Sequence, residues 1–156
     1  MASIRFLIRD RNEDVLDPAE ALDFVNDPRF GGINLFLGRV RDSNHGRNVL
    51  GISYDMFQPL ALARFGQIAA EIQGKYGPSI KIYIAHAFGR LDIGDPAVLI
   101  AVGTPHRDEA YRASRDLIEA VKHTSPIWKQ EHFSDGDSVW SEGCSLCGHE
   151  HGPPHS

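Results

Sequence analysis

The order of helix-like and strand-like segments constrains the fold of this chain most strongly. Two long segments have the apolar spacing of amphipathic helices, at about residues 59–74 and 106–123. Two strand-like segments separate them, one alternating at residues 80–84 and one apolar throughout at residues 97–102. Before the first long helix come three further strand patterns, at residues 3–9, 33–41 and 49–57, and a short helix at residues 17–26. Because helices and strands do not alternate strictly, the pattern predicts an α+β domain rather than a doubly wound sheet.

Length and composition are those of one globular domain. The 156 residues suffice for one core, and 42% hydrophobic and 24% charged residues are ordinary values. The net charge of -5 argues against a general binder of nucleic acids or anionic membranes. The first apolar run is too short for a signal peptide, and no stretch approaches the roughly 20 apolar residues that span a bilayer. We therefore expect a cytoplasmic protein.

The segment at residues 122–131 concentrates lysines in a chain that has few. The protein has four lysines against twelve arginines, and Lys122 and Lys129 are two of the four. Pro126 ends any helix that carries Lys122, and Trp128 can anchor the extended segment that follows, with Lys129 on the opposite side. Lysine is the basic residue that enzymes use when the pKa of the side chain must be shifted or when a covalent adduct with the substrate must form. The alternative is a pair of solvated surface lysines around a buried tryptophan.

Other basic side chains stand at the ends of expected elements. Arg39 and Arg41 end a strand, and His106 and Arg107 follow a sharp turn into a helix N-terminus, where N–H groups and the helix dipole favour anions. Each residue taken alone is equally consistent with a solvated charge, and His106 with a helix-capping role. Their concurrence in an acidic protein predicts a phosphate-bearing substrate. Between strands, the polar stretch at residues 42–48 predicts a turn-rich, mobile loop.

Five short motifs occur in the order and spacing of one known family: residues 36–41, Tyr54-Asp55, residues 86–94, His106-Arg107 and residues 122–131. Together they resemble the catalytic (large) subunit of molybdopterin synthase, and the resemblance covers roughly residues 3–142. It implies an α/β hammerhead fold with a mixed, largely antiparallel sheet in a domain of residues 1–142. It also implies an enzyme, a sulfurtransferase of molybdenum cofactor biosynthesis that builds the dithiolene of molybdopterin on cyclic pyranopterin monophosphate.

The resemblance also implies partners and residue roles. The sulfur donor is a small ubiquitin-like carrier protein with a C-terminal Gly-Gly thiocarboxylate, and the large subunits form a homodimer within a heterotetramer. Lys122 is placed at the thiocarboxylate and Lys129 beside the pterin, which makes these two the catalytic candidates. The substrate-binding candidates are Arg39, Val40, Arg41, His106, Arg107, Lys122, Lys129, Gln130 and Glu131. No metal or redox cofactor is required for this step.

The C-terminal end departs from the family pattern. The family often carries an arginine near Gly143 that reaches the other subunit's active site, and this chain has no arginine after Arg115. The cross-dimer substrate contact is therefore in doubt or falls to another residue. Residues 143–156 read as a flexible Cys/His-rich tail. Cys144, Cys147, His149 and His151 are candidate zinc ligands there, although one CxxC with closely following histidines is not a standard zinc-finger spacing.

Two other functions are compatible with the same residues. One is a hydrolase or acyl transferase that acts alone on a phosphorylated small molecule, with His106 as base and Arg39 and Arg107 as clamps. The other is a non-catalytic module that binds the tail of a ubiquitin-like protein, which the loss of the late arginine favours. A stable complex with a Gly-Gly-ended carrier excludes the hydrolase, and pterin conversion excludes the binding module.

Overall fold

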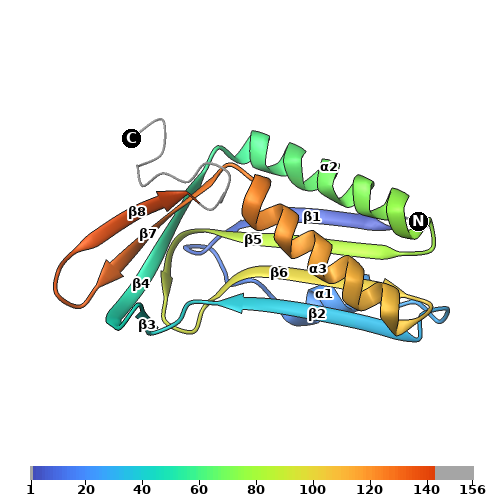
Figure 1. The fold of residues 1–156 in the computed structure, drawn as a ribbon, viewed down its shortest axis with the longest axis horizontal. Coiled ribbons are helices and arrows are strands. Elements are labelled where there is room, and N and C mark those ends of the chain that lie inside the picture. The colour runs from blue at the N-terminus through green and yellow to red at the C-terminus, as the bar shows by residue number, and fades with distance from the viewer. Residues whose placement is uncertain (1, 143–156) are drawn as a thin grey trace.

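An open sheet of eight strands forms the frame of the computed structural model, which describes residues 2–142 (Figure 1). The strands run in the spatial order β2-β6-β5-β4-β7-β8; in addition, β1 pairs with β5 and β3 with β4. Among the strands of residues 2–142, only the β1–β5 pairing is parallel. The elements are β1 (Ile4–Asp10), α1 (Pro18–Phe24), β2 (Gly32–Arg39), β3 (Ser43–Asn44), β4 (Arg47–Met56), α2 (Gln58–Tyr76), β5 (Lys81–Asp92), β6 (Pro96–Thr104), α3 (Arg107–Thr124), β7 (Ile127–Phe133) and β8 (Ser138–Glu142). The predicted α+β fold with a mixed, largely antiparallel sheet is confirmed.

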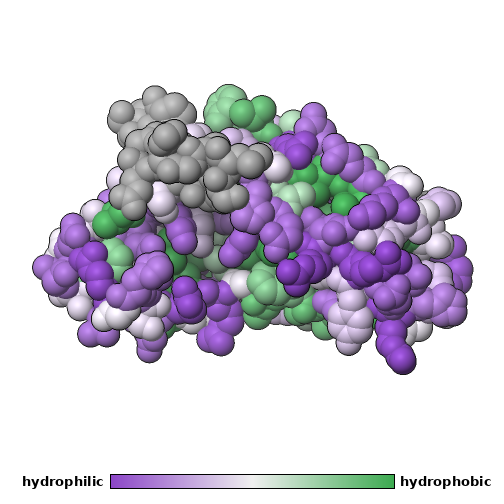
Figure 2. All heavy atoms as spheres, viewed as in Figure 1, coloured by the Kyte–Doolittle hydropathy of each residue, from purple (hydrophilic) through white to green (hydrophobic). Residues whose placement is uncertain are grey.

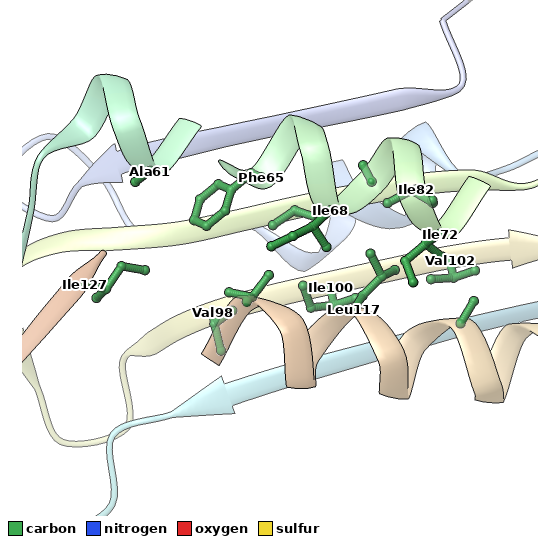
Figure 3. Packing of buried hydrophobic residues seen from close by; sticks show 14 of the residues in the cluster. Ala61, Phe65, Ile68, Ile72, Ile82, Val98, Ile100, Val102, Leu117 and Ile127 are labelled. Atoms are coloured by element: carbon green, nitrogen blue, oxygen red, sulfur yellow. The ribbon is translucent and has the colours of Figure 1, made fainter. Parts of the chain in front are cut away.

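The central strands are buried on both faces. Helices α2 and α3 lie side by side over one face, and α1 lies on the other (Figure 1). Under α2 and α3, Phe65, Ile68 and Leu117 pack onto Ile82 and Ile100 (Figure 3). The core on the opposite face contains Ala21 of α1 and Val25 at its C-terminal end. They pack with the strand side chains that alternate with those of the first core, including Tyr83, Ala85 and Leu99. Because side chains alternate along a strand, β5 and β6 supply both cores, which explains their nearly continuous apolar sequence.

Helix ends follow the local sequence. Asp17 is the N-cap of α1, where its Oδ1 accepts a hydrogen bond of 2.9 Å from the Ala19 amide, and Pro18 occupies the first turn. Ser125-Pro126 ends α3 in extended backbone, as the proline predicts. Hydrophilic side chains predominate over α2 and α3, with apolar patches between them (Figure 2). Apolar side chains are also exposed at the start of α2, where Phe57 and Leu60 are 58% and 54% exposed.

Strand β5 extends well beyond the predicted segment at residues 80–84. It continues through Gly89, which the sequence pattern marks as part of a turn region. Residues 81–86 pair with β6, whereas residues 89–92 pair with β4. Gly89 has φ +97°, and this left-handed backbone lets the strand bend from one set of partners to the other. The bend turns β4, β7 and β8 away from the main sheet and opens a hollow between them and the end of α3.

The polar stretch at residues 42–48 is a short hairpin in the structure. Ser43 pairs with Asn48 and Asn44 with Arg47, so His45-Gly46 forms a two-residue turn. Both turn residues have positive φ, +50° and +77°, as a type I′ turn requires. The predicted loop thus contains strand β3 and projects from the start of β4.

Candidate functional site

A basic cavity lies where β4, β7 and β8 meet the ends of β2 and α3. Figure 1 shows that β2 and α3 both end at this side of the molecule. The cavity has a volume of about 550 Å³. Its lining includes five lysine or arginine side chains and one carboxylate, namely Arg39, Arg41, Arg47, Lys122, Lys129 and Glu131. A local cationic site therefore exists in a chain whose net charge is -5.

The alternation of β7 selects which of its side chains enter the cavity. Lys129 and Glu131 line it, whereas the intervening Gln130 instead donates a hydrogen bond of 3.0 Å to Ser138 Oγ. Across the antiparallel pairing, Lys129 stands opposite Tyr54, and Glu131 stands opposite Ile52. Directly opposed residues share a face, so Tyr54 and Ile52 form the adjacent wall. Of the two predicted neighbours of Lys129, the structure thus brings Glu131 into the cavity but turns Gln130 away.

The end of β2 contributes Arg39 and Arg41 but not the residue between them. Arg39 Nε donates a hydrogen bond of 3.1 Å to the Gly94 carbonyl, which fixes the side chain against the β5–β6 turn. Val40 is only 3% exposed and packs in the core on the α1 face. Its backbone pairs with Gly94 and Asp95, which braces the strand end. The structure gives Val40 a supporting role, not a place in the lining.

The cations of the cavity differ in how they are neutralised. Arg47 donates to Asp135 and Asp137 at 2.9 and 3.0 Å and lies 3.7 Å from the centroid of the Phe133 ring. These carboxylates raise the pKa of Arg47. Within residues 2–142, Arg41, Lys122 and Lys129 form no ion pair with a carboxylate. Their positive charge is available to an anionic ligand.

Glu131 is held by the β3–β4 hairpin. Asn44 Nδ2 donates to both carboxylate oxygens of Glu131 at 2.9 Å. The charge of Glu131 and, above all, burial raise the pKa of Tyr54 to about 12, so the Tyr54 hydroxyl stays protonated at neutral pH. Neither Asn44 nor Tyr54 was among the predicted binding residues.

A smaller cavity of about 150 Å³ adjoins the large one and shares Tyr54, Lys122 and Lys129 with it. Its other lining residues are Val98, Val121, Ile127 and His86. The His86 ring meets the Tyr54 ring edge-on with centroids 4.9 Å apart. Burial lowers the pKa of His86 to about 4. The hydrogen bond with the Ala87 carbonyl opposes this effect, and the charge of Lys122 adds a smaller lowering effect.

His106 and Arg107 lie at the other end of α3. Arg107 precedes Lys122 by fifteen helical positions, which corresponds to about 22 Å along the axis. His106 and Arg107 line a separate depression together with Gly31 and Asp108. The side chain of His106 makes no capping hydrogen bond, although His106 is the N-cap residue of α3. One chain therefore does not bring His106 and Arg107 to the cationic cavity.

Known proteins resemble this chain over most of its length. The family model described as MoaE protein matches residues 11–124. A molybdopterin synthase catalytic subunit of Synechococcus elongatus is 47% identical over 127 residues, which cover 81% of this chain and 77% of that protein. The crystal structure of molybdopterin synthase from Staphylococcus aureus has a TM-score of 0.79 and 34% identity, covering 90% of this chain and 98% of that one.

The chain belongs to the MoaE family. A further member, the catalytic subunit of Bacillus subtilis, is 37% identical over 124 residues, 80% of this chain and 78% of that protein. Membership confirms the resemblance in the sequence and the enzyme class that it implies, a sulfurtransferase of molybdenum cofactor biosynthesis.

Tyr54, His86 and Asn44 are among the lining residues of this MoaE-family chain that the sequence did not predict, for different reasons. Tyr54 and His86 stand in two of the quoted motifs, but no reactive pairing in the sequence singled them out. Strand alternation could have indicated Tyr54, because it lies two positions from Ile52 and therefore shares its face of the strand. In the structure that face stands opposite Lys129. Asn44 offered none, since its contact with Glu131 joins residues 87 positions apart.

Residues 2–142 contain no group of three histidine, cysteine or acidic side chains that could hold a metal ion. No helix in the same range has the length and apolar character to cross a membrane. The zinc-ligand candidates Cys144, Cys147, His149 and His151 lie outside the described residues.

Proposed function

We propose that the cationic cavity binds cyclic pyranopterin monophosphate and receives the thiocarboxylate end of a ubiquitin-like carrier protein. The observation that carries the proposal is the convergence of Arg41, Lys122 and Lys129, without ion pairs among the described residues, on one cavity. The substrate phosphate and the thiocarboxylate are both anions. Holding them together requires preorganised cations, and this cavity supplies them.

Lys122 is proposed to position the sulfur donor. A thiocarboxylate is already an anionic nucleophile, so the enzyme has no need to generate one, and no metal or redox cofactor is required. Its sulfur forms a bond to a carbon of the pterin substrate as a carbon–oxygen bond at that carbon breaks, and the departing oxygen takes up a proton. Water then cleaves the resulting acyl–sulfur bond. The sulfur stays on the pterin, and the carrier leaves with an ordinary carboxylate. A second carrier repeats the transfer to complete the dithiolene.

Lys129 is proposed to move protons on the pterin. It shares one face of β7 with Glu131, and Asn44 holds that carboxylate at two 2.9 Å contacts. A lysine ammonium group can donate a proton to a leaving oxygen or nitrogen. Arg39 and Arg41 at the end of β2 are suited to the phosphate, since guanidinium groups bind phosphate oxygens in pairs.

The partners proposed are the carrier and a second copy of this chain. A solved complex of subunits 1 and 2 of the molybdopterin-converting factor from Helicobacter pylori has the same fold, with a TM-score of 0.69 and 24% identity. We propose an analogous complex here, built on a homodimer and located in the cytoplasm. In that homodimer the second copy would supply His106 and Arg107 to the cavity, because one chain separates them from Lys122 by about 22 Å.

The separation of His106 from Arg39 also bears on the alternative hydrolase. That mechanism needs His106 as base beside Arg39 on one substrate within a single chain. The two residues line different depressions, one at each end of α3. The geometry therefore favours sulfur transfer over a hydrolase that acts alone.

A reconstituted reaction tests the proposal. The purified protein is mixed with thiocarboxylated carrier and cyclic pyranopterin monophosphate, and molybdopterin is followed as its fluorescent oxidation product. Product that depends on this chain is the expected result. A stable carrier complex without product would indicate the non-catalytic binding module. Absence of both complex and product would overturn the proposal and return attention to a phosphate-ester hydrolase.

A further inference from the structure

His86 occupies a position where the strand pattern calls for an aliphatic side chain. Along β5, Ile82 and Ile84 face α2 and α3 and belong to the core on that side. Two residues further on, His86 continues the same face and is 6% exposed. Its partner across the strands is Val98, also a core residue. A buried imidazole costs free energy unless its nitrogens are hydrogen-bonded, so the histidine requires a reason.

The hydrogen bond of the ring fixes its tautomer. Nδ1 lies 2.8 Å from the Ala87 carbonyl oxygen, which can only accept. Nδ1 therefore carries the hydrogen. Burial keeps the ring neutral at pH 7 by lowering its pKa to about 4. It follows that Nε2 has no hydrogen and presents a lone pair. Within residues 2–142 no side chain or backbone group is hydrogen-bonded to Nε2.

The cavity beside this ring is narrow and poor in hydrogen-bond acceptors. Val98, Val121 and Ile127 form apolar walls around about 150 Å³, and Lys122 and Lys129 stand where it joins the larger cavity. The two lysines can only donate hydrogen bonds. Among the lining side chains, the acceptors are the neutral His86 ring and the Tyr54 hydroxyl.

This combination matches the end of an extended chain without side chains. A glycine backbone fits between apolar walls, and its terminal anion can remain beside the lysines. Each N–H that enters leaves water and needs an acceptor, since a buried N–H without a hydrogen bond is unfavourable. His86 lines the smaller cavity and not the large one, whereas Lys122 and Lys129 line both, so its Nε2 is a candidate acceptor for a chain that passes the two lysines.

We propose that His86 Nε2 accepts a hydrogen bond from a backbone N–H of one of the carrier's last two residues, and so fixes the depth at which its thiocarboxylate stops beside Lys122. This inference rests on the proposed function, because it assumes that a carrier tail enters the site. His86 is then a substrate-binding residue selective for a terminal segment that retains its amide hydrogens. A tail with proline or an N-methylated residue at the bonded position would be rejected.

The test measures the coupling between the two partners of this hydrogen bond. Carriers ending in an ordinary carboxylate are made by semisynthesis with glycine or N-methylglycine at the last or the penultimate position. Their dissociation constants are measured by calorimetry with the wild-type protein, His86→Phe and His86→Gln. N-methylation at one of the two positions should weaken wild-type binding about tenfold. The same change should alter binding to His86→Phe less than about twofold, and His86→Gln, whose amide oxygen can accept, should retain part of the discrimination.

A measurement on the wild-type protein guards against variants that fail to fold. The ¹⁵N resonance of His86 Nε2 should move upfield when the glycine-ended carrier binds, because the lone pair becomes hydrogen-bonded. The N-methylated carrier should leave that resonance in place. Equal losses on N-methylation in wild type and His86→Phe, or an unmoved resonance with a tightly bound carrier, would overturn the inference and leave the proposed function standing. Failure of every carrier to bind wild type would overturn both.

Discussion

At the scale of single residues, the site is distinguished by charges that the fold leaves unneutralised. Arg47 and Lys75 are each paired with aspartates, at 2.9–3.0 Å, whereas Lys122 and Lys129 form no ion pair within residues 2–142. Lysine charges that face one cavity repel one another, and this repulsion is relieved when an anion binds. The fold thus keeps electrostatic free energy available for the substrate.

The two lysines should be essential for turnover and dispensable for folding. We expect Lys122→Ala and Lys129→Ala each to lower molybdopterin formation by at least about 100-fold, the scale at which a lost proton donor or charge stabiliser acts. The free energy of unfolding, measured in urea, should change by less than about 0.5 kcal/mol, since neither lysine has an ion pair to lose. Lys75→Ala is the matched control, because it removes an exposed lysine far from the cavity. Wild-type turnover in either site variant would remove that lysine from the mechanism.

The buried histidine should make the protein sensitive to acid. Its pKa is about 4 in the folded state and about 6.5 when unfolded, so between these values only the unfolded chain binds the proton. Stability should therefore fall as pH drops from about 6.5 to 4, by at most about 3 kcal/mol from this group. His86→Phe should lose most of this dependence. The pKa of His132 is also lowered, by burial and by Arg90, and its contribution should persist in both proteins.

Denaturant unfolding at several pH values between 4 and 7 measures this difference. Parallel curves of stability against pH for wild type and His86→Phe would show that the imidazole is not buried in its neutral form.

At the scale of elements, the β3–β4 hairpin is a wall of the site attached by side chains. Asn44 reaches Glu131 on β7, and Arg47 reaches Asp135 and Asp137 in the β7–β8 turn. The aspartates and Arg47 are exposed, so each ion pair alone contributes little. Hairpin geometry is set instead by the type I′ turn at His45-Gly46.

Changing the turn should therefore loosen the wall without unfolding the protein. Gly46 has φ +77°, and a methyl group added there would meet no atom within 4 Å, so Gly46→Ala costs backbone strain alone, about 1 kcal/mol. We expect faster amide hydrogen exchange at residues 43–49 and a several-fold loss of turnover. Gly46→Asn should behave as wild type, because asparagine tolerates this backbone.

A second glycine provides the opposite expectation. Gly74 is exposed in the last turns of α2, and a methyl group there also meets no atom within 4 Å. Because its backbone is helical, Gly74→Ala should raise stability by about 0.5–1 kcal/mol with unchanged turnover. Thermal unfolding shows whether Gly74→Ala raises or lowers the stability of the protein. If both alanine variants shifted stability in the same direction, the conformational argument would fail for one of them.

At the scale of the whole molecule, the candidate residues lie at two ends of α3. Lys122 lines the cationic cavity, and Arg107 lies near Gly32, where an added Cβ would be 2.8 Å from the Arg107 Cα. This close approach fixes the start of the helix on β2. The rigid helix keeps the two ends apart, so a site that uses both needs two chains.

Mixing inactive variants tests whether two chains build one site. If Arg107 of one copy completes the cavity of the other, Lys122→Ala and Arg107→Ala homodimers should both be inactive. Unfolding and refolding an equal mixture should restore about a quarter of wild-type activity, because half the dimers are mixed and each contains one intact site. Activity no higher than that of the separate variants would show that each site is built from one chain.

Much of the architecture follows from periodicity, and the differences have local causes. The two long helices and the strand at residues 96–104 match their sequence patterns closely, because burial imposes their apolar spacing. The pattern predicts too short a strand β5 because Gly89 indicates a turn, whereas here it bends a continuous strand. It predicts a loop in place of the hairpin at residues 43–48 because two-residue strands carry no periodic signal.

For the site, the kind of chemistry is predicted from the sequence and its resemblance to a known family, whereas the set of lining residues depends on the fold. The basic residues at element ends predict a cationic site, and the resemblance carried by five motifs implies sulfur transfer. Only the folded chain turns Gln130 and Val40 away from the cavity and brings in Tyr54, His86 and Asn44. Charge and reactivity belong to the side chain itself, but proximity depends on strand register and on bends that join residues far apart in sequence.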